Sequence, residues 1–209
     1  NSLFLPIISK NHADIPSHFV SLNKEKITLD KNITVLGFPG SDIEEVKANL
    51  FNLNQKIYNK YGGFKDFQMV MILPDGNQDK IQAIMLEFRR LSNDLKNWHF
   101  LFGKPEDIET YFNSFNFKNT LNDNSGTSLV YIIDKEKCLR GRKGQKINSK
   151  VEYRECYNTI SAAELHNEMS DDVKILLREY RLALKKNKRK DEFRDKIEQE
   201  VVKKESSQK

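Results

Sequence analysis

The order of buried strands and amphipathic helices constrains the fold of this chain more than any other feature. Four apolar segments have the length and composition of strands: 33–38, 67–73, 98–102 and 128–133. Three segments with apolar residues at helical spacing separate them: 41–61, 78–92 and 105–115. Two weaker strand-like segments, 17–22 and 26–29, precede the first strand, and the chain turns at 134–137 before it returns from Cys138. Strands joined by crossover helices run parallel, and a closing hairpin adds an antiparallel strand. The sequence therefore predicts one layered α/β domain with a mixed central sheet flanked by helices.

The last fifty residues have a different pattern. Ser161 and Glu164 form a capping box, after which apolar residues recur at helical spacing as far as Leu184. A basic run follows at 185–190, and beyond it only Phe193, Ile197 and Val201 continue the stripe. This pattern predicts a long C-terminal helical extension that ends in a solvated, partly disordered basic tail. We therefore expect two parts, a domain over 1–160 and an amphipathic helix with its tail over 161–209.

The composition excludes several classes of protein. The net charge is +5, but 30 acidic residues accompany the 35 basic ones. This balance argues against a nucleic-acid-binding protein, in which positive charge normally gathers in one patch. No apolar run approaches the roughly 18 residues that span a bilayer. A hydrophobic fraction of 38% with 10% aromatic residues is sufficient for one core.

Several short motifs resemble the Sco/SenC branch of the thioredoxin-like superfamily. They are Leu5-Pro6, Asn49-Leu50, Trp98-x-Phe100-Leu101-x-Gly103, and Tyr131-Ile132-Ile133-Asp134 followed by Leu139-Arg140-Gly141. Their order and spacing carry the resemblance, which covers about residues 5–142. It implies a thioredoxin-like fold and a location outside the bacterial cytoplasm, on the periplasmic side. It also implies a membrane anchor in an N-terminal segment absent from this chain, which begins at Asn1.

The resemblance fails at the residues that carry the family's chemistry. Sco/SenC proteins bind copper or exchange disulfides during cytochrome oxidase assembly, through a Cys-x-x-x-Cys and a distal His. Alignment on Asn49-Leu50 places Pro39 and Ile43 at the two cysteine positions. Alignment on Ile133-Asp134 places Gly126, or its neighbour Asn124 or Ser125, at the His position. Neither Pro nor Ile can ligate Cu(I) or attack a disulfide. We therefore expect a degenerate site, no catalytic residue, no metal ligand and no cofactor.

The only two thiols of the chain are Cys138 and Cys156. If 138–144 and 150–156 form a hairpin with its turn at Ile147, the two cysteines face each other across it and could form a disulfide. Such a bond would stabilise the fold by roughly 3 kcal/mol in the chain-entropy model. Two unrelated thiols are the alternative, and a relocated copper or redox site is a third interpretation.

Other polar motifs indicate ordinary structure. The four histidines include no pair at the spacing of a zinc site. The glycine-containing segment 37–41 could hold an anion at a helix N-terminus, but the acidic residues that follow it favour a structural turn. Asp75 and Asp79 resemble the start of a calcium loop whose Gly and distant Glu are missing, which favours solvated turn residues.

We therefore interpret the sequence as a non-catalytic thioredoxin-like binding or assembly factor of the bacterial cell envelope, linked to the maturation of a respiratory oxidase or another metalloprotein. The alternative function is a copper chaperone or thiol–disulfide oxidoreductase with a relocated cysteine site. An unknown protein partner or anionic lipid is the expected ligand. The candidate contact residues are Ser41, Asp42 and Glu44 at the first helix, and Lys185, Lys186, Lys188, Arg189 and Lys190 in the basic run.

Overall fold

The computed structural model describes residues 4–92 and 94–208. Residue contacts divide the chain into a unit over Leu5–Asp172 and a second unit that contains the helix from Val173 onward. Residues 1–3, 93 and 209 lie outside the described part. The start of the predicted domain 1–160 and the last residue of the predicted extension 161–209 therefore lie outside it as well.

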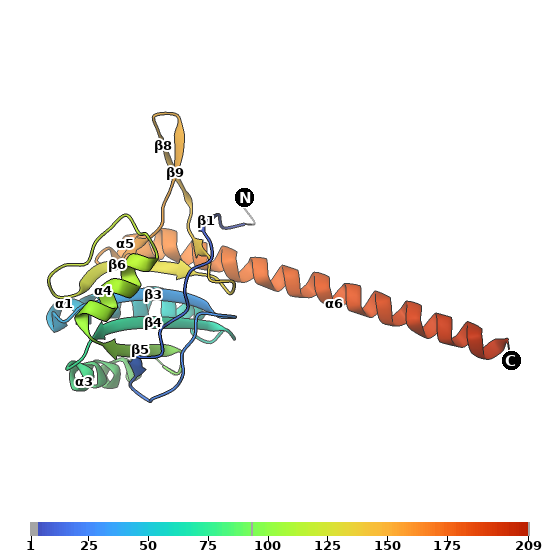
Figure 1. The fold of residues 1–209 in the computed structure, drawn as a ribbon, viewed down its shortest axis with the longest axis horizontal. Coiled ribbons are helices and arrows are strands. Elements are labelled where there is room, and N and C mark those ends of the chain that lie inside the picture. Colours follow the sequence, from blue (N-terminus) through green and yellow to red (C-terminus); the bar gives the residue numbers. More distant parts are fainter. Residues whose placement is uncertain (1–3, 93, 209) are drawn as a thin grey trace. The chain divides into compact units, whose positions relative to one another are not determined.

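The Leu5–Asp172 unit is built on one mixed sheet with the strand order β1-β7-β6-β3-β4-β5-β2, in which β10 also pairs with β6 (Figure 1). Its strands are β1 (Ile7–Ser9), β2 (Val20–Ser21), β3 (Ile33–Pro39), β4 (Phe67–Pro74), β5 (Trp98–Gly103), β6 (Gly126–Ile133), β7 (Leu139–Arg140) and β10 (Tyr157–Asn158). The neighbours β3, β4 and β5 are parallel, whereas β6 runs antiparallel to β3. The predicted mixed sheet is confirmed.

Helices cover both faces of the sheet, which explains why the central strands are continuous apolar runs rather than alternating ones. They are α1 (Ile43–Leu53), η1 (Asn54–Tyr58), α2 (Asn59–Tyr61), α3 (Gln78–Arg89), α4 (Pro105–Ser114), α5 (Ala162–Glu164) and η2 (Leu165–Met169). On one face, Tyr111 and Phe112 of α4 pack with Phe38, Val70 and Leu101 in an apolar core cluster. On the other, Phe88 of α3 contacts Trp98, with ring centroids 6.3 Å apart.

The N-terminal segments differ from the prediction. Ile7–Ser9 forms an edge strand that was not predicted, whereas 26–29 is not a strand and only Val20–Ser21 of 17–22 is. The physical reason is the carboxylate of Asp14, which accepts a hydrogen bond from the Leu29 amide at 2.7 Å. A side chain thus satisfies a backbone donor that a strand would pair in the sheet.

A second, separate sheet consists of the hairpin β8 (Lys143–Ile147) and β9 (Lys150–Tyr153). Figure 1 shows this hairpin projecting away from the main sheet, and every residue of β8 is exposed. Asn148 and Ser149 both have positive φ, 49° and 65°, as the two central residues of a type I′ turn require. The turn therefore lies at 148–149, one residue beyond the predicted Ile147.

The C-terminal helix α6 (Ser170–Ser207) is 38 residues long. The N-cap half of the predicted capping box is present, because Ser161 Oγ accepts a hydrogen bond from the Glu164 amide at 3.1 Å. The reciprocal half is not, because the Glu164 carboxylate accepts from the Asn158 amide and the Ser161 amide donates to the Asn158 carbonyl. All residues from 181 to 208 are exposed. No helix in the described part of the chain is both long and apolar enough to cross a membrane.

Candidate functional site

The two segments that the resemblance assigned to the family's site meet in the structure. Pro39 is the last residue of β3 and pairs with Gly126, the first residue of β6. Ile43 is the first residue of α1, four positions after Pro39, and is half-buried. Two separate sequence alignments had placed these three residues at one site, and the pairing of β3 with β6 brings Pro39 and Gly126 side by side.

Close backbone packing leaves no space for larger side chains at this place. A β-carbon added to Gly126 would lie 2.7 Å from the carbonyl oxygen of Pro39 and 2.8 Å from the Cα of Gly40. Gly40 has φ +83°, a conformation that residues with a β-carbon rarely adopt. The Ser41 amide donates to the Asn124 carbonyl at 3.1 Å and ties the two segments together. Any side chain at position 126 would force β3 and β6 apart.

The residues present do not fit copper. Pro39, Ile43 and Gly126 offer no side-chain donor atom, and soft thiolates or imidazoles are the ligands that Cu(I) prefers. Among residues 4–92 and 94–208, no group of three or more His, Cys, Asp or Glu side chains could hold a metal ion.

The first turn of α1 contributes acidic surface. Asp42 occupies the N-cap position of α1 but makes no side-chain capping bond. Glu44 lies in the first turn and is exposed, while Ser41 is half-buried. Carboxylates at this end of a helix are favoured by its dipole, and they repel a bound anion. Of the segment 37–41, Gly37 to Pro39 belong to β3, and only Gly40 and Ser41 form the turn that leads into α1.

The two cysteines occur as free thiols. Cys138 is buried, and its Sγ donates to the Glu136 carbonyl at 3.8 Å, whereas Cys156 is half-buried and accepts from Asn119 at 3.7 Å. Burial, reinforced by Asp134, raises the pKa of Cys138. Burial, reinforced by Glu155, raises the pKa of Cys156 to about 11. Both thiols are therefore almost entirely protonated at neutral pH and are poor nucleophiles.

The hairpin that was expected to align the two cysteines pairs different residues. In β8 and β9, Lys143 lies opposite Tyr153 and Ile147 lies opposite Lys150. Cys138 precedes β7 in the main sheet, and Cys156 precedes β10. The predicted register is wrong because the chain between Cys138 and Lys143 first pairs with β1 and β6 before it enters the hairpin.

The histidines occupy four unrelated places. His12 lies 2.6 Å from Ser9 Oγ, and His18 lies 3.8 Å from the Asp107 carboxylate. His99 belongs to β5 and His166 to η2.

Asp75 and Asp79 both lie at the turn before α3. Asp75 accepts a hydrogen bond from Gln78 at 3.4 Å, and Asp79 lies in the first turn of the helix. These contacts belong to the turn and the helix start.

The basic run lies in the exposed part of α6. Lys185, Lys186, Arg189 and Lys190 flank the exposed Phe193. Lys188 approaches Glu192 at 3.9 Å, an exposed pair of small energetic value.

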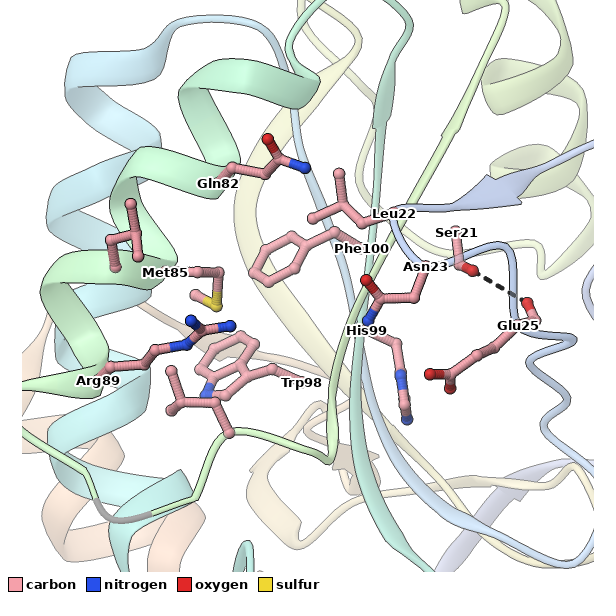
Figure 2. Close-up of a pocket in the computed structure, with 12 residues that line it drawn as sticks. Ser21, Leu22, Asn23, Glu25, Gln82, Met85, Arg89, Trp98, His99 and Phe100 are labelled. Carbon is pink, nitrogen blue, oxygen red and sulfur yellow. Dashed lines mark hydrogen bonds between the residues drawn. The ribbon is translucent and has the colours of Figure 1, made fainter.

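Sequence reasoning missed a pocket of about 320 Å³ between α3, β5 and the loop after β2 (Figure 2). Its lining comes from three segments: α3 (Gln82, Met85 and Arg89), β5 (Trp98, His99 and Phe100) and the loop (Asn23 and Glu25). One part of the signal was available, since Trp98 and Phe100 share a face of a strand, and Met85 and Arg89 share a face of a helix. Asn23 and Glu25 lie in the polar turn predicted between 17–22 and 26–29, and nothing in the sequence indicated that this turn lies beside α3 and β5.

Solved structures that are similar to this chain identify its fold. A scan against protein-family models and a search of curated proteins each gave no match. A SCO1/SenC family lipoprotein from Bacillus anthracis str. Ames superposes with a TM-score of 0.54 at 18% identity, over 85% of this chain and 97% of that one. BsSco, described as a member of the Sco family of cytochrome c oxidase assembly proteins, gives a TM-score of 0.57 at 11% identity, over 84% and 97%. A putative electron transport protein from Aquifex aeolicus VF5 gives 0.51 at 13% identity, over 79% and 96%.

The superpositions cover 97%, 97% and 96% of these similar chains, at identities that establish the fold alone. The chain therefore has the thioredoxin-like fold of the Sco/SenC structures.

Proposed function

We propose that this protein is a non-catalytic, thioredoxin-like binding or assembly factor of the bacterial cell envelope, which acts in the maturation of a respiratory oxidase or another metalloprotein. The proposal combines the fold with the residues at the place where that fold's chemistry is expected. One observation carries it: the backbone of Pro39 and Gly40 fills the space that a side chain at position 126, the expected place of the family's His, would need.

The chemistry of the two segments supports the same conclusion. A copper or disulfide-exchange site needs side chains with lone pairs or a thiolate, and Pro39, Ile43 and Gly126 supply neither. Filling the site with backbone atoms also stiffens the junction of β3, α1 and β6. A rigid surface of this kind suits recognition, because little conformational freedom is lost on binding.

A relocated cysteine site is the rival function, and the state of the two thiols argues against it. A reactive cysteine needs a lowered pKa and access to solvent. The pKa of Cys156 is raised to about 11 by burial, and that of Cys138 is raised by burial as well. Asp134 and Glu155, the carboxylates beside them, disfavour the thiolates further.

The envelope location rests on the descriptions of similar structures. One of the similar structures is described as a lipoprotein and another as an assembly protein of cytochrome c oxidase. The contact surfaces of the proposal are the acidic start of α1, with Ser41, Asp42 and Glu44, and the basic run at 185–190. From Lys185 to Lys196 the helix carries seven basic and three acidic residues, a local charge of +4.

Turnover assays test the non-catalytic part. Reduced protein is mixed with insulin and dithiothreitol, and precipitation of the insulin chains is followed beside thioredoxin as the positive control. We expect a rate equal to that with dithiothreitol alone. Catalysed reduction that disappears in Cys138→Ser or Cys156→Ser would refute the proposal and establish the oxidoreductase function.

Truncation tests the contact surface on α6. A chain that ends at Leu184 retains the whole Leu5–Asp172 unit and removes the basic run. With vesicles containing anionic lipid, we expect the full chain to co-sediment at low salt and the truncated chain to remain in solution. Equal sedimentation of both chains would remove the basic run from the proposed surface, and vesicles of zwitterionic lipid are the control.

A further inference from the structure

The pocket beside β5 lies away from the β3–α1–β6 junction and has the composition of a ligand site. Figure 2 shows α3 on one side, the loop after β2 on the other side and β5 between them. Its volume of about 320 Å³ lies at the lower end of the range for small-molecule pockets. Such a volume accommodates one large side chain or a small aromatic molecule.

The inner wall of the pocket is aromatic. Trp98 and Phe100 stack with ring centroids 5.6 Å apart and ring planes 6° from parallel. Trp98 donates its indole N–H to the Asn54 side chain at 3.1 Å, inside the core, so it presents only apolar ring atoms elsewhere. Met85 and the exposed Leu86 extend this apolar wall from α3. The wall therefore suits an apolar or aromatic group.

Polar side chains without partners surround this wall. Within the described residues, the side chains of Arg89, Gln82 and Asn23 form no hydrogen bond and no ion pair. Two arginines elsewhere in the domain are engaged by carboxylates: Arg140 bonds Asp134 at 2.6 Å, and Arg142 bonds Asp172 at 2.9 Å. The Arg89 guanidinium thus keeps its donors available at the pocket, and a guanidinium pairs best with a carboxylate.

The charges are separated across the pocket. In Figure 2, Arg89 lies on the α3 side, whereas Glu25 and His99 lie on the opposite side. Burial lowers the pKa of His99, so the imidazole is neutral at neutral pH and leaves Glu25 as the charge on that side. This separation of charge orients a ligand that has one carboxylate and one N–H group. The carboxylate faces Arg89, and the N–H donor faces Glu25.

We propose that this pocket binds an aromatic carboxylate that carries an amide N–H, with the carboxylate on Arg89, the ring against the Trp98 wall and the N–H toward Glu25. Two sources share this chemistry: an N-acylated aromatic amino acid, and the C-terminal residue of a peptide. The pocket shares no residue with the junction at Pro39 and Gly126. A failed test of ligand binding at the pocket would therefore leave the proposed non-catalytic function unaffected.

The test uses Trp98 as the reporter, because it is the only tryptophan of the chain. Fluorescence of the full chain is titrated with N-acetyl-phenylalanine, and with N-acetyl-phenylalanine amide, which lacks the carboxylate. We expect a saturable change for the acid with a dissociation constant between roughly 0.1 and 3 mM, as its size allows. In Arg89→Gln this binding weakens about tenfold through loss of a charged hydrogen bond. Arg90→Gln, a neighbouring exposed arginine outside the pocket, binds as the unchanged protein does.

The tripeptide Ala-Ala-Phe, with a free and with an amidated C-terminus, identifies the source. Tighter binding of the free tripeptide than of N-acetyl-phenylalanine assigns the pocket to peptide C-termini, and equal or weaker binding assigns it to the small acid. Backbone amide NMR shifts at α3 and β5 provide a second readout for each titration. The proposal is overturned if no ligand gives a saturable change in either readout up to about 10 mM. It is also overturned if acid and amide bind equally, or if Arg89→Gln and Arg90→Gln bind the acid alike.

Discussion

Replacing Gly126 by alanine should destabilise the protein, because the junction of β3 and β6 is closed by backbone atoms. The added β-carbon would lie 2.7 Å from Pro39 O, 2.8 Å from Gly40 Cα and 2.9 Å from Pro39 C. All three contacts are shorter than a van der Waals contact, and none is with a flexible side chain that can move away. Gly126 has no positive φ, so the whole effect is steric.

The expected magnitude follows from overpacking. Forcing an extra carbon into a filled site costs about 1–3 kcal/mol. The lower entropy of an unfolded chain with alanine offsets about 0.4–1 kcal/mol of this loss. A net loss of roughly 1–2 kcal/mol lowers the melting temperature by about 2–8 °C for a domain of this size.

The measurement is chemical and thermal unfolding of three proteins, followed by circular dichroism. Gly63→Ala is the matched control, since a β-carbon there has no neighbour within 4 Å and φ is ordinary. That control should unfold with an unchanged or slightly raised free energy, by up to about 1 kcal/mol. If Gly126→Ala is as stable as Gly63→Ala, the junction has room for a side chain and the argument against a ligand at position 126 fails.

Three further predictions concern buried charge, the N-cap at Ser161 and the thiols. Arg140→Ala should lower the free energy of unfolding by about 3–5 kcal/mol, because it leaves the buried Asp134 carboxylate without its cation, and urea unfolding measures this. Ser161→Ala should cost about 1 kcal/mol through loss of the bond to the Glu164 amide; an unchanged urea midpoint would contradict it. Alkylation of Cys156 by iodoacetamide should be slow at pH 7.5 and rise about tenfold per pH unit until the pKa of about 11 is reached, as mass spectrometry would show; a rate that levels off near pH 8.5 would refute the raised pKa.

The central fold could be predicted from the sequence because its signals are local. Strands such as β4 are buried on both faces and appear as unbroken apolar runs, and Pro105 begins α4 at the first helical position, where proline is favoured. The edge strand β1 could not be predicted, because three residues carry little pattern and its pairing with β7 is non-local. The non-strand conformation at Leu29 could not be predicted either, because its amide is bonded by the carboxylate of Asp14, which is distant in sequence.

The candidate sites also include features that the sequence shows and features that depend on contacts between distant segments. The absence of sulfur at Pro39 and Ile43 is visible in the sequence, but the close approach of Gly126 to Pro39 depends on the β3–β6 register. The hairpin turn was misplaced because Asn148 and Ser149, rather than Ile147, adopt the positive φ that a tight turn needs. The pocket at Trp98 joins three segments distant in sequence, so only the structure reveals it.

The measurement that tests the central claim most directly is an anaerobic competition titration of the fully reduced protein with Cu(I) and a chromophoric chelator. The same titration of the Cys138→Ser/Cys156→Ser double variant serves as the control. The account predicts that the chelator retains the copper in both cases, because the junction of β3, α1 and β6 offers no ligand and both thiols stay protonated. Stoichiometric transfer of Cu(I) to the reduced protein, lost in the double variant, would contradict it and place a working copper site at the cysteines.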